Sequence, residues 1–321
     1  MVISGVGGVT LTDSNFGDLI FQDTATFDFA DYDDNGTDDT TDDIITPNGQ
    51  SITVSTETFT ANPVHRVEVI EESNETIGYI MYNSFRSNFE TELNAAFGEL
   101  SAANVDHLVL DLRYNGGGSI LTATRLASMI TGQFGNQPYA NNINGPNRQD
   151  ENTVFNFNDS LEDGTAVNSL NLDKVYVLTT DGSASASELT INALRPYIEV
   201  VQIGTNTSGK TTSNRLVFDS PDFGTSQVTS AHTYALFPLT GNVTNINDEE
   251  VPSTGLVPNI LLEESRANFG TLGNPTEPLL ARAIAEITGN GRFTNNLNDS
   301  GSLELKSKKQ EEPLQGYMYY K

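Results

Sequence analysis

Apolar and polar positions recur with two different periods along this chain. Between residues 61 and 290, short apolar or alternating runs are bounded by Gly, Asn, Asp or Pro, and such runs predict strands. Longer segments that place apolar residues three and four positions apart predict amphipathic helices. The predicted strands are residues 65–72, 76–85, 107–113, 174–180, 198–204 and 214–219, and the predicted helices are residues 88–100, 119–132, 187–196 and 275–289.

Strands and helices follow each other in turn through most of this stretch, which is typical of an α/β fold with a mostly parallel sheet. Three segments are expected: an acidic, β-rich N-terminal region (1–60), a core (61–290) and a polar, flexible tail (291–321). Within the core, residues 136–170 are rich in Asn and poor in apolar side chains. We therefore expect a surface excursion there.

The charge of the chain excludes one class of partner. It has 43 acidic and 16 basic residues and a formal net charge of −27, whereas a nucleic-acid-binding surface needs clustered Lys and Arg. No stretch approaches the roughly 18 consecutive apolar residues of a membrane span. The first residues lack the basic start and apolar core of a signal peptide. Because there is no Cys, disulfides and thiol chemistry are excluded.

Candidate chemistry gathers where two predicted strands end, because sites in parallel sheets lie at the carboxyl ends of strands. The strand at 107–113 is followed by Gly116, Gly117 and Gly118. Three glycines allow positive φ and close approach of a ligand to backbone N–H groups, although a tight turn would also explain them. The Lys and Ser or Thr of a phosphate loop do not follow.

The second strand end carries three alternating serines, Ser183, Ser185 and Ser187, in the segment TTDGSASASELT. One interpretation is structural: Ser185 caps the next helix, and Glu188 completes a capping box. The other is chemical: the small neighbours leave the Ser185 hydroxyl accessible, and free N–H groups at a helix start suit a developing oxyanion. A serine nucleophile needs a base, and none of the three histidines is near in the sequence.

Lys210 is the candidate base. It follows Gly209 at the end of the strand 198–204, and a right-handed crossover would bring this end beside that of the serine's strand. The other five lysines lie in the tail or at the start of a strand. A lysine in a poorly solvated site has a lowered pKa, and its neutral amine can take the proton of a serine.

Three blocks, LVLDLRYNGGG, DGSASASE and GKTT, resemble the signatures of the C-terminal processing (tail-specific, tricorn-like) serine peptidases. The family order is DLR-x-N-x-GG, then SASASE, then GK, and the middle serine is the nucleophile. Lys210 follows Ser185 by 25 positions, which is the family spacing and favours Ser185 over its neighbours. The resemblance covers residues 60–290, and the end of the core looks like that of Bacteroidetes-type members.

The resemblance implies a Clp-protease/crotonase-like core in which Ser185 is the nucleophile and Lys210 the general base. It implies an oxyanion hole made by the N–H of Ala186 and a glycine N–H, preferably that of Gly117, with the other two glycines as alternatives. No metal or organic cofactor is implied, and polypeptides would be the substrates. Relatives of this type are usually exported, so the periplasm or cell surface is the expected location.

One position departs from the family pattern. Many members place Gln four residues after the lysine to orient it, and here this position is Asn214. On a strand, Asn214 would share a face with Lys210 and retain an amide group. We therefore expect Asn214 to be an orienting residue.

The expected function is that of a serine endopeptidase acting on unfolded or C-terminal polypeptide segments. Two alternatives stay open. One is a catalytically silent homologue that binds peptides in the same groove, and the other is a hydrolase of small-molecule esters or amides.

The expected selectivity follows from residues 1–60. Many family members capture the substrate C-terminus with a PDZ domain, and this segment is too short and too acidic to be one. Because end recognition needs a dedicated carboxylate-binding nest, amidating the C-terminus of a peptide substrate should change its cleavage rate little. A tenfold loss of rate, or about 1.4 kcal/mol, would refute this prediction.

The acidic run at residues 31–43 is a second candidate site. Its spacing matches the calcium-loop pattern D-x-D-x-N-G-x₅-E, with Asp in place of the final Glu. An optional structural Ca²⁺ site and a solvated acidic loop both fit this pattern, and no flanking helices are expected. The candidate ligands are Asp31, Asp33, Asn35 and Asp42.

Overall fold

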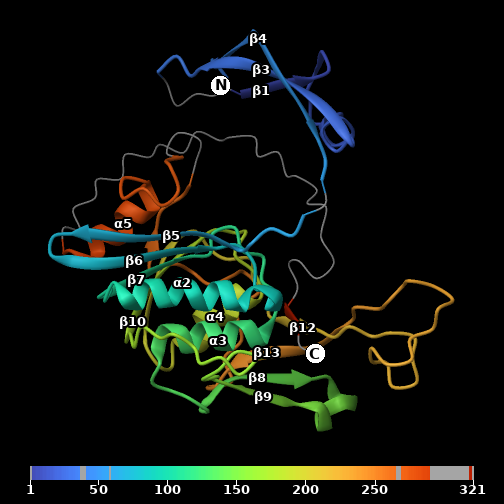
Figure 1. Ribbon diagram of the computed structural model, residues 1–321, viewed down its shortest axis with the longest axis vertical. Helices are drawn as coiled ribbons and strands as arrows, with labels where there is room; N and C mark the ends of the chain where they lie inside the picture. Colours follow the sequence, from blue (N-terminus) through green and yellow to red (C-terminus); the bar gives the residue numbers. More distant parts are fainter. Residues whose placement is uncertain (1, 37–40, 58, 265–268, 290–317, 320–321) are drawn as a thin grey trace. The chain divides into compact units, whose positions relative to one another are not determined.

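The computed structural model describes residues 2–36, 41–57, 59–264, 269–289 and 318–319 (Figure 1). These residues form two compact units, of which the first ends at Ala61 and the second begins at Asn62. Apart from residues 318–319, the tail expected at 291–321 lies outside the described residues.

The first unit is a four-stranded antiparallel sheet with the strand order β2-β1-β3-β4. The short β-like patches of the sequence are the strands of this sheet. Its elements are β1 (Val2–Val6), β2 (Val9–Thr10), α1 (Phe16–Ile20), β3 (Thr24–Asp33) and β4 (Ile44–Ser55).

The candidate calcium ligands lie on and after β3, in the connection to β4. Asp31 Oδ1 accepts a hydrogen bond from Asn48 Nδ2 (2.9 Å), and Asn35 Nδ2 donates to Asp42 O (2.6 Å). Residues 37–40 of this connection lie outside the described residues. In the part of the chain that the structure describes, no group of three or more His, Cys, Asp or Glu side chains is arranged to hold a metal.

The calcium site therefore stays a prediction, and titration calorimetry tests it. If the loop binds Ca²⁺, we expect weak binding with a Kd of about 10⁻⁴–10⁻³ M, as in sites with few rigid ligands. The heat should disappear in an Asp31→Asn, Asp33→Asn double variant. A flat titration of the unmodified chain into the millimolar range would leave only a solvated acidic loop.

The second unit contains a six-stranded sheet with the strand order β14-β11-β10-β7-β6-β5. Its neighbours are parallel except for β5 and β6, which form an antiparallel hairpin. The prediction of a mostly parallel sheet is confirmed. The strands are β5 (Val64–Glu72), β6 (Glu75–Tyr82), β7 (His107–Asp111), β10 (Lys174–Thr179), β11 (Glu199–Gly204) and β14 (Ile260–Leu261).

Helices cover both faces of this sheet (Figure 1). Since alternate residues of a strand point to opposite faces, Leu108 and Leu110 join the core formed with α2, α3 and α4, while Val109 joins the core formed with α5. No helix among the described residues has both the length and the apolar character needed to cross a bilayer. The helices are α2 (Glu90–Ala102), α3 (Ile120–Thr131), α4 (Ala186–Leu194) and α5 (Pro278–Ile287), with short 3₁₀ turns η1 (Ser87–Phe89) and η2 (Pro146–Glu151).

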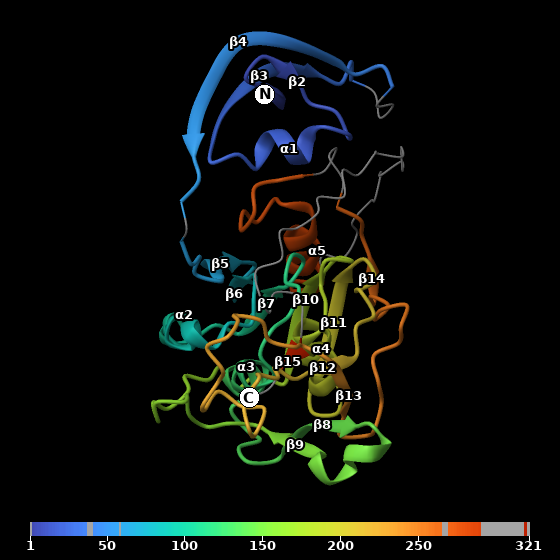
Figure 2. The ribbon, with the colours of Figure 1, turned by 90° about the vertical axis from the view of Figure 1, so that its right-hand side faces the viewer.

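A second sheet, with the order β15-β12-β13-β8-β9, packs against α3 and α4 (Figure 2). Most of its pairs are antiparallel, but β15 runs parallel to β12. Its strands are β8 (Pro138–Asn144), β9 (Thr153–Asn156), β12 (Thr212–Asn214), β13 (Leu239–Asn245) and β15 (Met318–Tyr319).

The surface excursion expected at residues 136–170 is wrong for residues 138–144 and 153–156, which form β8 and β9. Tyr139 is fully buried, and the inward-facing asparagines of β8 make hydrogen bonds to β12 and to the 3₁₀ turn η2. Asn142 Oδ1 accepts from Ser213 Oγ (2.5 Å), and Asn144 Nδ2 donates to the carbonyl of Glu151 (2.7 Å). The low apolar content misled the prediction because short amides can line a buried sheet face when they are hydrogen-bonded.

The strand predicted at residues 214–219 is displaced toward the N-terminus. β12 spans Thr212–Asn214, and Val217 makes only an isolated bridge with Leu236. Asn214 pairs with Leu239, the first residue of β13. Regular strand pairing therefore ends at Asn214, and beyond it only Arg215 and Val217 make backbone hydrogen bonds to residues 236–238 among the described residues.

Candidate active site

Ser185 lies at the sharp turn between β10 and α4. Its backbone has φ 62° and ψ −114°, a combination that non-glycine residues rarely adopt. The residue is completely buried. A strained serine between a parallel strand and a helix is the geometry of a nucleophile elbow.

The three alternating serines have different hydrogen bonds. Ser183 Oγ donates to the carbonyl of Leu112 (2.8 Å), and Ser187 Oγ donates to the carbonyl of Asn115 (2.8 Å). Ser185 Oγ, in contrast, is buried without a hydrogen-bond partner among the described residues. A buried unpaired hydroxyl costs free energy, so its presence favours a functional role for Ser185 and a structural role for the other two serines.

Glu188 connects the serine turn to the lysine loop. One carboxylate oxygen, Oε2, accepts the N–H groups of both Ser185 (2.9 Å) and Lys210 (2.8 Å). The other, Oε1, accepts the N–H of Gly209 and the hydroxyl of Thr207, both at 2.6 Å. The capping box expected from the sequence is present: Glu188 binds the Ser185 amide, and the Ser185 hydroxyl faces the N–H of Glu188 without the geometry of a hydrogen bond.

Lys210 is half-buried in the loop between β11 and β12. The expectation that Lys210 and Asn214 share one strand face is wrong, because β12 begins only at Thr212. Asn214 is 1% exposed, its Nδ2 donates to the carbonyl of Phe237 (3.1 Å), and its Oδ1 has no partner in the described part of the chain. The geometry brings Ser185 and Lys210 together through Glu188 and leaves the role of Asn214 a prediction.

The glycine loop packs directly against the serine turn. Gly117 has φ 106°, and a Cβ atom built on it would lie 2.6 Å from Cβ of Ser185 and 2.9 Å from N of Ala186. Gly118 is equally constrained, since its Cβ would lie 2.3 Å from the carbonyl oxygen of Phe85. Only glycine permits this approach, which places the loop beside the first N–H of α4.

Asn115 holds this loop in place. Its Nδ2 donates to the carbonyl of Tyr82 (2.8 Å), and its Oδ1 accepts the N–H of Gly117 (2.9 Å). The preferred oxyanion-hole amide, that of Gly117, is therefore engaged by a side chain in this arrangement. Gly116 and Gly118 stay the alternatives, and an oxyanion hole that used Gly117 would need the Asn115 side chain to turn away.

Arg113, at the start of the glycine loop, is fully buried among carboxylates. Its guanidinium donates to Asp111 (2.8 Å), Glu277 (2.8 Å) and Glu264 (2.6 Å). Burial alone would lower the pKa of Arg113, but the hydrogen bond to Glu277 and the charge of Asp111 raise it above its usual value. Burial and the hydrogen bond to Asp111 likewise raise the pKa of Tyr79.

This cluster was missed in the sequence. Glu277 caps the N-terminus of α5 by accepting the N–H of Leu280 (2.9 Å), so Arg113 fixes that helix to the strand that leads into the glycine loop. The sequence contained one signal for this cluster, a single Arg in an otherwise mainly apolar strand. A cation buried there needs acidic partners. Nothing in the sequence pointed to a partner more than 150 residues away.

Replacing Arg113 with Met should lower the free energy of unfolding by about 3–5 kcal/mol, because it leaves buried carboxylates without their cation. Urea denaturation measures this change. The matched control is Arg66→Met, which removes an exposed pair with Glu68 (2.8 Å) and should cost less than about 1 kcal/mol. Equal effects of the two substitutions would show that the buried cluster adds no stability.

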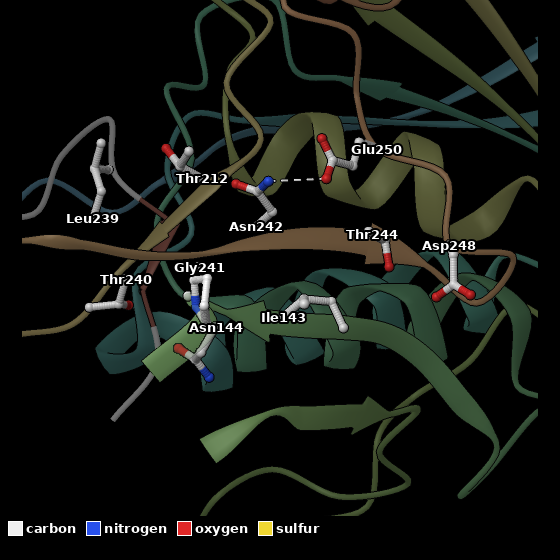
Figure 3. Close-up of a pocket in the computed structure, with 12 residues that line it drawn as sticks. Ile143, Asn144, Thr212, Leu239, Thr240, Gly241, Asn242, Thr244, Asp248 and Glu250 are labelled. Carbon is white, nitrogen blue, oxygen red and sulfur yellow. Dashed lines mark hydrogen bonds between the residues drawn. The ribbon is translucent and has the colours of Figure 1, made fainter. Parts of the chain in front are cut away.

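A surface cavity of about 620 Å³ lies elsewhere, over β8, β12 and β13 (Figure 3). Asn242 Nδ2 donates to Glu250 Oε1 (3.0 Å) at its wall. Thr212 lines it, whereas Ser185, Lys210 and the glycine loop do not. The cavity therefore belongs to the five-stranded sheet and not to the serine site.

A serine at a strained turn, a glycine loop packed on it and a lysine whose backbone N–H shares a carboxylate with the serine N–H lie together at the carboxyl ends of parallel strands, where α/β sheets commonly carry their sites. The chain belongs to peptidase family S41, whose sequence profile matches residues 76–246, more than half of the chain. The resemblance seen in the three sequence blocks is confirmed.

Proteins that are similar to this chain are described as S41, carboxyl-terminal-processing or CtpA-like proteases. A solved structure from Bacteroides fragilis, described as an S41 protease, superposes with a TM-score of 0.74 at 28% identity and covers 90% of this chain and 72% of that one. A carboxyl-terminal-processing protease of Picosynechococcus sp. is 26% identical over 242 residues, and a CtpA-like serine protease of Staphylococcus epidermidis is 29% identical over 147. The matches cover 74% and 46% of this chain but only 51% and 28% of the two proteases.

Proposed function

We propose that this chain is a serine endopeptidase in which Ser185 is the nucleophile and Lys210 the general base. The observation that carries the proposal is the hydroxyl of Ser185, the one member of three adjacent serines that is buried and has no hydrogen-bond partner among the described residues. Family membership and the shared contact of both residues with Glu188 support it.

The chemistry follows from the two groups. The neutral amine of Lys210 takes the proton of Ser185 Oγ as this oxygen forms a bond to the carbonyl carbon of the substrate. The N–H of Ala186 and a glycine N–H of the adjacent loop stabilise the resulting oxyanion. The lysine ammonium then gives its proton to the leaving amine, and water, activated by the same lysine, hydrolyses the acyl-enzyme.

The substrates in this proposal are unfolded polypeptides or the C-terminal segments of polypeptides, encountered in the periplasm or at the cell surface. The names of the relatives support C-terminal processing. This chain spans about half the length of the Picosynechococcus protease. That this chain has the activity of the whole relative is therefore itself part of the proposal.

An activity-based serine probe, combined with a panel of peptide and ester substrates, tests the proposal. We expect labelling at Ser185 and cleavage of unstructured peptides, both absent in Ser185→Ala. Labelling with hydrolysis of small esters alone would favour the small-molecule hydrolase. Peptide binding without labelling or cleavage would favour the silent, peptide-binding homologue.

A further inference from the structure

Two residues far from the core in sequence complete the second sheet. β15 (Met318–Tyr319) pairs with β12 in parallel, with Met318 opposite Ser213 and Tyr319 opposite Asn214 (Figure 2). β12 is the strand that directly follows the loop of Lys210. The segment at 318–319 is therefore bound beside the proposed catalytic loop.

The site that β15 occupies is a sheet edge. β12 pairs with β13 on one side, and β15 is its only neighbour on the other side within the described residues. Without β15, the backbone N–H and C=O groups of β12 on that side would be unpaired, which is the template that an extended polypeptide recognises by strand addition.

Met318 is held by its side chain as well as its backbone. It is 1% exposed and belongs to the large apolar core on the α2, α3 and α4 side of the six-stranded sheet. Its partner Ser213 is fully buried and donates a hydrogen bond to Asn142 Oδ1. An unbranched apolar side chain fits such a position, whereas a charged one would be buried without a partner.

We propose that the edge of β12 is the binding site for an extended polypeptide substrate, and that residues 318–319 of the chain occupy it as an internal competitor, with Met318 in place of an apolar substrate side chain. This inference rests on the proposed function and adds a subsite to it. The site would select substrates with Met, Leu or a similar side chain at this position. Any substrate must first displace the resident segment, so the apparent affinity is reduced by the fraction of time that the edge is free.

The first test uses the full chain with Met318→Asp, which places a charge in the buried position. We expect kcat/KM for an unstructured peptide to rise by roughly tenfold, through a lower KM, because the competitor no longer holds the edge. The matched control is Met318→Leu, which keeps an apolar side chain at the buried position and should leave kcat/KM unchanged. An unchanged or lower kcat/KM in Met318→Asp overturns the proposal.

The second test does not need activity. A fluorescein-labelled peptide GYMYYK (residues 316–321) should bind saturably to the Ser185→Ala, Met318→Asp double variant, as measured by fluorescence polarisation, while GYDYYK should not. Binding without cleavage by any variant would refute the proposed function and leave this site standing. Cleavage without peptide binding would refute the site alone.

Circular dichroism and thermal melting accompany both tests, because Met318→Asp could simply unfold the chain. Met318→Ala is the milder variant, for which we expect a smaller fall in KM and weaker competition. If both variants lose the fold, Met318 is a structural core residue and the proposal is wrong.

Discussion

Ser185→Ala should reduce peptide hydrolysis by at least about 10³-fold, since the loss of one member of a catalytic unit removes most of its effect. Its thermal stability should be unchanged or slightly higher, because the hydroxyl that it removes is buried and unpaired. Hydrolysis of a peptide with a chromogenic leaving group and thermal melting measure the two quantities on the same preparation.

The neighbouring serines are the matched controls. Ser183→Ala and Ser187→Ala each remove a hydrogen bond to a backbone carbonyl and should cost about 1 kcal/mol of stability while retaining activity within a few fold. Ser185→Ala should thus lose activity and keep its stability, whereas Ser183→Ala and Ser187→Ala should lose stability and keep activity. Wild-type rates in Ser185→Ala, or inactivity confined to Ser183→Ala, would assign the nucleophile elsewhere.

Lys210→Arg should be as inactive as Lys210→Ala. Guanidinium keeps the positive charge and much of the reach of the lysine, but it does not deprotonate in a protein. If Lys210 only supplied charge, Arg would preserve much of the activity. If it is the base, the rate of the unmodified chain should rise with pH as neutral amine accumulates. The low residual rates of Lys210→Arg and Lys210→Ala should not rise with pH in this way.

A control for Lys210→Arg is Lys174→Arg, at an exposed pair with Glu199 (3.0 Å). This change keeps the charge at the start of β10 and should alter neither the rate nor its pH profile. Substantial activity in Lys210→Arg, with an unchanged profile, would contradict the role of Lys210 as a base.

The central sheet could be predicted from the sequence because its strands are short apolar runs that alternate with helical periodicity. The second sheet could not. β8 carries inward-facing asparagines that imitate a loop in composition, and β12 is three residues long. β15 pairs with a strand about 100 positions away, and long-range pairing of two residues leaves no local pattern.

The proximity of Ser185, Lys210 and the glycine loop was predictable from the sequence, but the contacts that join them were not. The three sequence blocks located Ser185 and Lys210, yet the sequence did not distinguish a capping box from a bifunctional carboxylate at Glu188. That distinction depends on where the loop after β11 returns in space. The engagement of the Gly117 amide by Asn115 is likewise a tertiary contact of a side chain with its own loop.

The contact of the Glu188 carboxylate with both amides has a consequence for the order of events during synthesis of the chain. Ser185 emerges from the ribosome 25 residues ahead of Lys210, and the hydrogen bonds that Glu188 makes to both amides can form only after the strand and loop between them have been synthesised and folded. A nascent chain that ends before Lys210 therefore carries the proposed nucleophile without its proposed base. In the proposed mechanism, proteolytic competence would therefore require synthesis at least through Lys210 and closure of the loop that carries it.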